Sequence, residues 1–325
     1  MARHRLVVCV LFAVLTFAAV LAAGAPALFP VTQGERIGYV DEAGKIVINP
    51  QFAEAGPFSE GRARIVLGRR AGYIDTAGKI VVNPQFERGR EFQEGMAAVR
   101  MDDRWGYIDR DGKIVINPQF DDAGDFTEGR ARVKVAGRWG FIDDTGKFAI
   151  NPQFDDAGDF HEGLARVELG DLWGFVDTKG TIAINPQFER AADFSEGLAF
   201  VRLGERKGFV DGKGAFKIDA NYDDVGTYSD GLARFRMGGR DGYLDKTGKI
   251  AINPQFESAG DFHDGLAWFE LDDRYGYVDK AGKIAINPQF DEALPFENGL
   301  ARVKLGRGTW GYVDKTGKFI WNPTK

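Results

Sequence analysis

A glycine followed by Tyr or Phe returns at a fixed interval along this chain. Gly38, Gly72 and Gly106 lie 34 residues apart. The later members are Gly140, Gly174, Gly208, Gly242, Gly276 and Gly311. A period of this size indicates one supersecondary unit copied along the chain, and each copy buries its apolar face on its neighbours. The fold is therefore restricted to an array of similar units, and no single copy stands out as an active centre.

Each copy contains an Asp-x-x-Gly pattern, as in Asp109 to Gly112. An Asp at the first position of a turn accepts hydrogen bonds from the backbone two residues on. The Gly supplies the positive φ that a type I turn with a following bulge requires. The pattern therefore predicts a hairpin turn, and it favours a structural role for these aspartates over metal binding.

Short β-type runs flank this turn, Tyr107-Ile108 before it and residues 114–116 after it. The second run is followed by Asn117-Pro118. Because proline cannot donate to a ladder, we expect the strand to end there. The two runs predict an antiparallel hairpin.

A loop and a third strand complete the unit. Phe120 and Phe126 are the apolar anchors of the expected loop. Residues 131–135 then alternate strictly, which places Ala131 and Val133 on one face and Arg132 on the other. Each unit is thus expected to be a three-stranded meander with one ordered loop.

The fold class predicted for the chain is all-β, an array of 34-residue, three-stranded β-meander repeats. No helical apolar stripe of useful length occurs after the N-terminal segment. The chain offers nine hairpins but eight copies of the third strand. A closed ring would require whole blades, so the count favours an open, curved or superhelical array. A closed β-propeller is the alternative, because sequential small meanders are how blades are built.

These motifs together carry a family resemblance from residue 37 to the C-terminus. The Trp-Gly dipeptides are Trp105-Gly106, Trp139-Gly140, Trp173-Gly174 and Trp310-Gly311. With the Asp-x-x-Gly turns and the segment Phe194-Ser195-Glu196-Gly197, the chain resembles the bacterial WG-repeat family. The resemblance implies a β repeat and no catalytic residues. The copies that depart from the leading Trp have Ile37, Ala71, Lys207, Asp241 and Tyr275.

The N-terminus has a different composition. Arg3 and Arg5 precede an uncharged run that begins at Leu6, and small residues occupy 22–25. This order predicts a signal peptide over residues 1–25. An uncleaved membrane anchor is the alternative, because the uncharged run is long enough to span a bilayer.

The remaining chain divides into a short linker, 26–36, and the repeat array, 37–325, which holds eight full repeats and a terminal hairpin. The single cysteine, Cys9, lies in the N-terminal segment, so the array is stabilised by burial alone. A formal net charge of −6 argues against general nucleic-acid binding. We expect an exported protein, periplasmic, secreted or on the cell surface.

Candidate catalytic and metal residues are few. His161 and His263 occupy the same slot of the unit, where other copies have Ser, Thr, Gln or Glu, so we expect both to be exposed. The carboxylates Asp121, Asp122 and Asp125 match no calcium-loop spacing and predict a solvated acidic rim. No nucleophile or phosphate-loop motif occurs. We therefore expect no enzymatic activity, no metal site and no cofactor.

The outward face of the third strand is the most suggestive surface. Its first row predicts a binding strip made of Arg64, Arg132, Arg166, Phe200, Arg234, Trp268 and Arg302. If the units stack in register, the strip suits an anionic polymer, a glycan or an acidic protein. The alternative is that strand positions facing water simply favour long side chains.

Two functions remain open at this point. The first is an exported, non-catalytic scaffold that binds a protein or an anionic envelope polymer through its extended surface. The second is a small-ligand binder with a central pocket in a closed propeller, which ring closure would favour. Contact with a membrane is expected only if the N-terminal segment stays uncleaved.

Overall fold

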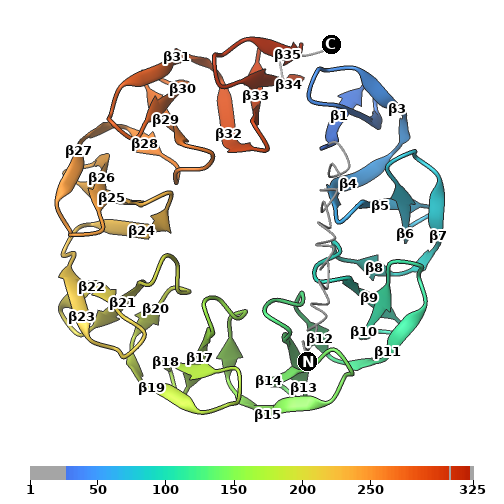
Figure 1. Ribbon diagram of the computed structural model, residues 1–325, viewed down its shortest axis with the longest axis horizontal. Helices are drawn as coiled ribbons and strands as arrows, with labels where there is room; N and C mark the ends of the chain where they lie inside the picture. Colours follow the sequence, from blue (N-terminus) through green and yellow to red (C-terminus); the bar gives the residue numbers. More distant parts are fainter. Residues whose placement is uncertain (1–26, 307–308, 323–325) are drawn as a thin grey trace, which may run out of the picture.

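The protein is a ring of nine small antiparallel sheets, a closed nine-bladed β-propeller (Figure 1). The computed structural model describes residues 27–306 and 309–322. The all-β class is confirmed and the propeller alternative is supported, whereas the preferred open array is wrong. The predicted signal peptide falls outside the described residues. Within them, no helix is long and apolar enough to cross a membrane.

Blades 2–9 each contain four strands that run in order from the inner rim of the ring to its outside (Figure 1). The innermost strands are β4 (Glu54–Ser59), β8 (Arg88–Gly89), β12 (Asp122–Ala123), β16 (Asp156–Ala157), β20 (Arg190–Ala191), β24 (Asp224–Ser229), β28 (Ser258–Ala259) and β32 (Glu292–Glu297). The second strands, including that of blade 1, are β1 (Phe29–Gln33), β5 (Arg62–Leu67), β9 (Met96–Met101), β13 (Ala131–Val135), β17 (Leu164–Leu169), β21 (Ala199–Leu203), β25 (Leu232–Met237), β29 (Leu266–Leu271) and β33 (Leu300–Leu305).

The outer half of each blade is the predicted hairpin. Its first strands are β2 (Arg36–Val40), β6 (Arg70–Asp75), β10 (Arg104–Asp109), β14 (Arg138–Ile142), β18 (Leu172–Asp177), β22 (Arg206–Val210), β26 (Arg240–Asp245), β30 (Arg274–Asp279) and β34 (Thr309–Asp314). The outermost strands are β3 (Ile46–Phe52), β7 (Ile80–Phe86), β11 (Ile114–Phe120), β15 (Phe148–Phe154), β19 (Ile182–Phe188), β23 (Phe216–Asp219), β27 (Ile250–Phe256), β31 (Ile284–Phe290) and β35 (Phe319–Trp321).

The predicted loop forms the innermost strand of the blade, so the unit has four strands rather than three. In blade 4 this strand has only two residues, and Gly124 N–H donates to Arg132 O just beyond it. Phe126 follows and is buried, as expected of an anchor. The strand is too short to show alternation, which is why the sequence pattern predicts a loop.

The outermost strand continues through its proline, contrary to the expected end at Asn117-Pro118. Trp105 pairs with Phe120 and Tyr107 pairs with Ile116, so the Asn-Pro-Gln segment bulges over Gly106. The strand lies at the edge of the blade, where a missing N–H and a bulge are both tolerated. A Cβ on Gly106 would lie 2.6 Å from Pro118 N, which explains the recurring glycine.

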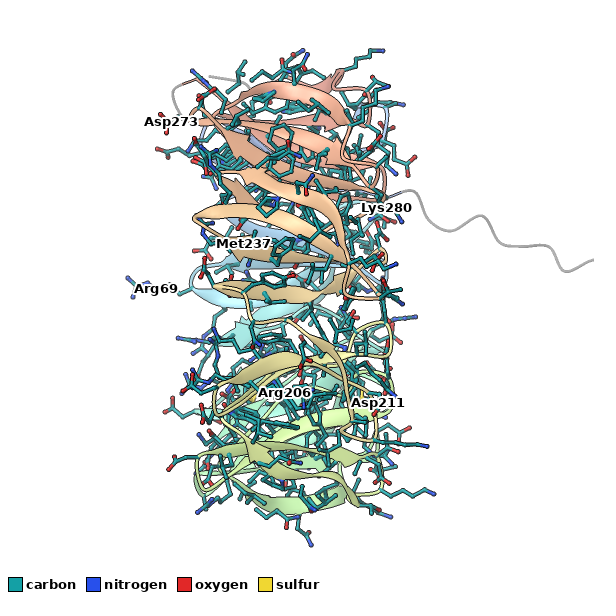
Figure 2. All side chains as sticks on the ribbon, turned by 90° about the vertical axis from the view of Figure 1, so that its left-hand side faces the viewer. Arg69, Arg206, Asp211, Met237, Asp273 and Lys280 are labelled. Carbon is teal, nitrogen blue, oxygen red and sulfur yellow. The ribbon has the colours of Figure 1, made fainter. Side chains whose placement is uncertain are left out.

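The Asp-x-x-Gly turns are confirmed. Asp109 Oδ1 accepts the N–H groups of Asp111 at 3.0 Å and Lys113 at 2.9 Å, and Gly112 has a φ of 82°. All turns of this kind lie on one face of the ring, where Figure 2 labels Asp211 and Lys280. The turns between second and third strands lie on the opposite face.

The core consists of the joints between blades. At the joint of blades 3 and 4, Tyr107 and Phe120 pack against Phe126, Ala131 and Val133. The rings of Tyr107 and Phe126 meet edge to face at 4.9 Å, and Tyr107 Oη donates to Gly124 O at 2.8 Å. The same arrangement recurs around the ring, so each blade is stabilised by both of its neighbours.

Strand β1 closes the ring. It is the ninth copy of the second strand of a blade, whereas the sequence showed only eight such strands beside nine hairpins. It pairs with β2 in the register that β5 has with β6, and it lies inside the segment 26–36 that we predicted to be a linker. Tyr312 Oη of blade 9 donates to Pro30 O at 2.9 Å, and its ring meets Phe29 at 5.4 Å. We call this joint between blades 9 and 1 the seam.

Candidate functional site

The predicted strip of arginines does not face water. Successive residues of a second strand point to opposite faces of the blade, and both faces are covered by neighbouring blades. Ala131 and Val133 pack on blade 3, whereas Arg132 points toward blade 5. Its side chain is 27% exposed, and that of Arg234 is 20% exposed. The prediction of an outward, solvent-facing row is therefore wrong.

Two arginines of the predicted strip, Arg132 and Arg166, each lie between an indole and a carboxylate. Arg132 Nε is 2.9 Å from Asp159 Oδ1 of the next blade, and its guanidinium lies 5.2 Å from the Trp139 ring. Its Nη1 also donates to Ala157 O at 2.7 Å. Arg166 repeats the geometry, 3.0 Å from Asp193. These contacts neutralise the arginines inside the ring and fix one blade against the next.

The other residues of the predicted strip are also half-buried and engaged. Arg302 lies 4.8 Å from the Trp310 ring. Phe200 contacts Phe209 at 5.6 Å between ring centroids, and Trp268 contacts Tyr275 at the same distance. Arg64 likewise sits at a joint and is half-buried. The structure therefore brings the seven residues to equivalent positions in successive blades without forming a continuous basic surface.

Asp121 is exposed, as the predicted acidic rim requires, but the acidic loops also contribute to the structure. Asp121 forms an ion pair with Arg104 and accepts Ala136 N–H at 2.7 Å. Burial raises the pKa of Asp125, and nearby Arg90 partly counteracts this. The prediction for the two histidines is confirmed, since both are exposed. Among the described residues no group of acidic, His or Cys side chains has metal-site geometry.

A ladder of carboxylates runs from blade to blade along the Asp-turn face. Glu94 Oε2 accepts Gly129 N–H at 2.8 Å, and Asp264 Oδ2 accepts Gly299 N–H at 2.8 Å. The position that follows in the series is Asn298, next to the seam. Blade 9, the last blade along the chain, thus has a neutral side chain in place of the acid.

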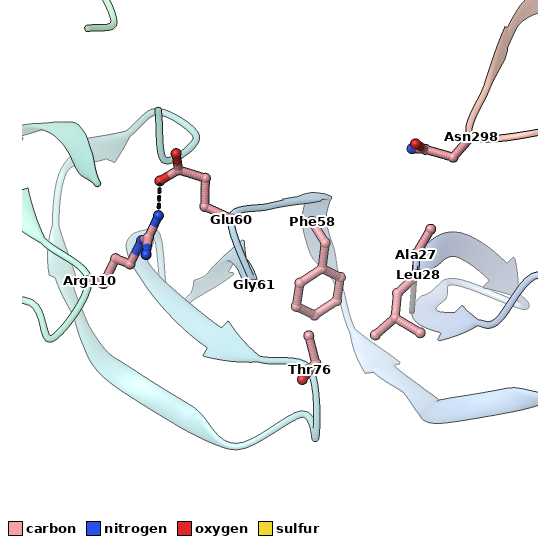
Figure 3. Close-up of a pocket in the computed structure, with 8 residues that line it drawn as sticks. All are labelled: Ala27, Leu28, Phe58, Glu60, Gly61, Thr76, Arg110 and Asn298. Carbon is pink, nitrogen blue, oxygen red and sulfur yellow. Dashed lines mark ion pairs between the residues drawn. The ribbon is translucent and has the colours of Figure 1, made fainter. Parts of the chain in front are cut away.

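The seam is where the inner layer of strands is interrupted. Among the described residues blade 1 has no innermost strand, whereas β4 and β32 occupy the inner rim on either side (Figure 1). A cavity of about 480 Å³ opens there, lined by Leu28, Phe58 and Asn298 and by the ion pair between Glu60 and Arg110 (Figure 3). A second cavity of about 280 Å³ adjoins it. We call the two together the seam groove.

Apolar side chains line the second cavity of the seam groove. Leu294 is 42% exposed, and Pro57 is exposed as well. Phe58 is half-buried, whereas Phe92 at the same position of the next blade is 1% exposed. The sequence carries a signal for this site that our prediction missed. Pro57 and Pro295 replace the acid found at that position in most other copies, and they flank the seam.

The family comparison agrees with the internal period. The model of the WG containing repeat matches eight times without long gaps, over residues 37–69, 72–105, 105–139, 139–173, 173–206, 208–240, 242–275 and 275–307. The chain belongs to the WG-repeat family. No curated protein matches the chain in sequence.

Solved structures share the fold of this WG-repeat protein at low sequence identity. One described as a crystal structure of the eukaryotic initiation factor has a TM-score of 0.60 and 11% identity, and the match covers 91% of this chain and 95% of that one. BamB from Moraxella catarrhalis has a TM-score of 0.48 and 9% identity, covering 81% and 94%. At these identities the likeness concerns the fold alone.

The WG repeats and the blades are out of phase. The match at 105–139 begins in β10, the third strand of blade 3, and ends in β14, the third strand of blade 4. Each repeat therefore supplies the outer hairpin of one blade and the inner strands of the next. The covalent unit crosses a joint, so consecutive blades are held by the chain itself as well as by packing.

Proposed function

We propose that this WG-repeat protein is an exported, non-catalytic scaffold that binds a partner polypeptide at the seam groove. The observation that carries the proposal is the interruption of the inner strand layer at blade 1. Within the described residues it leaves Leu294 and Pro57 exposed and Phe58 half-buried at the inner rim. Exposed apolar side chains gathered at one concave place are typical of sites that another macromolecule covers.

Charge narrows the chemistry of the partner. Glu297 is exposed at the seam groove, and burial together with Asp125 and Glu297 raises the pKa of nearby Glu91, with Arg64 acting in the opposite sense. Arg302 lines the second cavity with Glu297, and Glu60 is paired with Arg110 in the first. Because these charges balance, an uncharged apolar segment complements the groove. An anionic envelope polymer is less well supported, because the arginines expected to hold it are paired inside the ring. Nucleic acid is not expected, given the net negative charge.

Export is supported by the sequence of the N-terminal segment, with Arg3 and Arg5 before an apolar run and small residues after it. Cell fractionation tests it separately from binding. We expect the chain in the periplasmic, surface or secreted fraction, cleaved within residues 22–27. An intact, membrane-bound chain would favour the anchor, and a cytoplasmic chain would refute export.

Binding of a small ligand near the axis of the ring is the second candidate. Ring closure favours it, because closure directs the inner strands of eight blades toward one region. The seam groove shares β4 and β32 with this region, and the rest of its lining comes from blades 1, 2 and 9 and from Arg110 of blade 3.

The test of the scaffold function uses the full chain with a C-terminal affinity tag, expressed in its native host. Proteins retained from the envelope fraction are compared between wild type, Leu294→Asp and Leu169→Asp. Leu169 is 37% exposed but lies in blade 5, so it is a matched control for surface charge. We expect at least one protein retained by wild type and by Leu169→Asp and lost with Leu294→Asp. Equal retention by all three chains, or no retention, would exclude the seam groove as the binding site.

A further inference from the structure

The joint between blades 7 and 8 differs from the joints of blades 4 and 5 and of blades 5 and 6, where an arginine lies between an indole and a carboxylate. Asp241 occupies the position of the leading Trp and is 1% exposed. Its Oδ1 accepts Arg236 Nη1 at 3.0 Å, and its Oδ2 accepts Ala259 N–H at 2.9 Å. No other charged residue of the described chain is buried as completely. A buried carboxylate needs such partners, and here Arg236 and the Ala259 N–H supply them.

Asp241 also forms an ion pair with Arg234, whose guanidinium therefore lies away from the carboxylate of the next blade. Its Nη1 is 3.5 Å from Asp241 and its Nη2 is 2.7 Å from Asp224. At a regular joint the corresponding arginine pairs with the carboxylate of the next blade, as Arg132 does with Asp159. Here that carboxylate is Asp261, and within the described chain no Lys, Arg or His nitrogen forms an ion pair with it. Asp261 is thus a partly buried acid whose internal cation has been drawn elsewhere.

Burial raises the pKa of Asp261, and the positive charge of Arg234 only partly offsets this, with a smaller contribution from His263. The direction agrees with the geometry, because a carboxylate with a close guanidinium partner would be favoured in its charged form. A cation brought to Asp261 from outside would therefore replace an interaction that the regular joints already contain.

The adjacent aromatic residue is also without its usual cation. The indoles of Trp105, Trp139, Trp173 and Trp310 each have an arginine over the ring, at 4.8–5.4 Å. Trp268 instead stands in the arginine row of blade 8, and its indole lies so close over Gly260 that a Cβ there would collide with it. Among the described residues no Lys or Arg lies over the Trp268 ring. Its nearest aromatic neighbour is Tyr275, at 5.6 Å.

Asp261, Trp268 and His263 line one open pocket of about 480 Å³. Asp224, Asp241, Arg234 and Arg236 also line it, and their charges balance one another. The charge of Asp261 therefore gives the pocket one excess negative charge. Asp261 lies in the same pocket as the Trp268 indole, over which no Lys or Arg of the described chain lies. A carboxylate and an indole also flank Arg132, although its indole, Trp139, stands at the leading position, whereas Trp268 stands at the position of the arginine itself.

We propose that this pocket binds an organic cation, a guanidinium or ammonium group, with Asp261 accepting its hydrogen bonds and Trp268 contacting its charge through the ring face. The cation comes either from a free amine or from a Lys or Arg side chain of a partner. The inference is independent of the seam groove, since Asp261 and Trp268 lie in blade 8 and the lining of the two sites has only Pro295 in common.

The experiment titrates the full chain with two probes, agmatine and the blocked peptide Gly-Arg-Gly, by calorimetry and by the indole N–H signal of Trp268. Tighter binding of agmatine would identify a free amine as the ligand, and tighter binding of the peptide would identify a partner side chain. Asp261→Asn should weaken binding at least tenfold, because it removes a charge-assisted contact of about 1.5–3 kcal/mol, while each tenfold change is about 1.4 kcal/mol.

The matched control is Asp159→Asn, which changes the equivalent acid at a regular joint and should leave the affinity unchanged. Two further variants leave Asp261 itself unchanged. Trp268→Leu should weaken binding, and Asp241→Trp should block it by returning Arg234 to Asp261. Failure of both probes to bind at millimolar concentration, or equal affinity in wild type and Asp261→Asn, would overturn the proposal.

Discussion

Gly106→Ala tests the explanation given for the recurring glycine. The added Cβ would lie 2.6 Å from Pro118 N and 2.8 Å from the carbonyl carbon of Asn117, both of them backbone atoms of the bulge. Such atoms cannot rotate away as the end of a flexible side chain can, so the bulge or strand β10 must move. Overpacking of this kind costs about 1–3 kcal/mol, and the lower backbone entropy of Ala in the unfolded chain returns a part. We expect a net loss of about 2 kcal/mol.

The measurement is the free energy of unfolding in denaturant for wild type, Gly106→Ala and Gly56→Ala. Gly56 is the control, because its φ is ordinary and the nearest atom to an added Cβ is Glu91 Oε1 at 3.7 Å. We expect Gly56→Ala to change stability by no more than about 0.5 kcal/mol. Hydrogen exchange should show the loss of Gly106→Ala concentrated in β10 and β11. Equal stability of the two variants would refute the argument that the bulge requires glycine.

Two further predictions concern the seam and the turns. Tyr312→Phe removes the hydrogen bond to Pro30 O and should cost about 1 kcal/mol, with faster amide exchange in β1. The control, Tyr73→Phe, removes a hydrogen bond to Arg90 O at an interior joint and should leave amide exchange in β1 unchanged. Identical protection of β1 in both variants would contradict the role of Tyr312. The Thr145 hydroxyl holds the pKa of Asp143 below its ordinary value, so the turn contributes stability above the unfolded pKa of about 3.9 and loses it as the pH falls through the folded value. Asp143→Asn keeps the acceptor oxygen and should therefore lose less stability than wild type between about pH 5 and pH 3, measured as thermal midpoints; parallel curves would count against this linkage.

The outer hairpins could be predicted from the sequence because their signals are local. Asp109 and Gly112 specify a turn through their own backbone contacts, and the alternation of residues 131–135 specifies the buried face. Strand β11 escaped prediction at Pro118, since only its place at the edge of a blade makes the proline acceptable. Five of the eight innermost strands escaped it because two paired residues leave no periodic pattern.

Ring closure depended on a segment that lacks the motifs of the repeat. Phe29–Gln33 follows no Glu-Gly turn and contains no arginine. Only its pairing with β2 shows its role. The strip of arginines was misplaced for a related reason. Alternation indicates two faces, but whether Arg132 meets water or another blade is set by the ring. The cation pocket had a sequence signal in Asp241 and Trp268, two departures that lie in neighbouring blades and whose proximity only the fold reveals.

The phase difference between repeat and blade has a consequence for how such chains change length. Duplication or loss of one 34-residue copy adds or removes half of each of two blades, and the cut halves recombine into a complete blade. Both ends of the chain are untouched by the event, so β1 still meets blade 9's successor at a single seam. The number of blades can therefore vary during evolution while the interrupted inner layer, and any site built on it, is inherited once per ring.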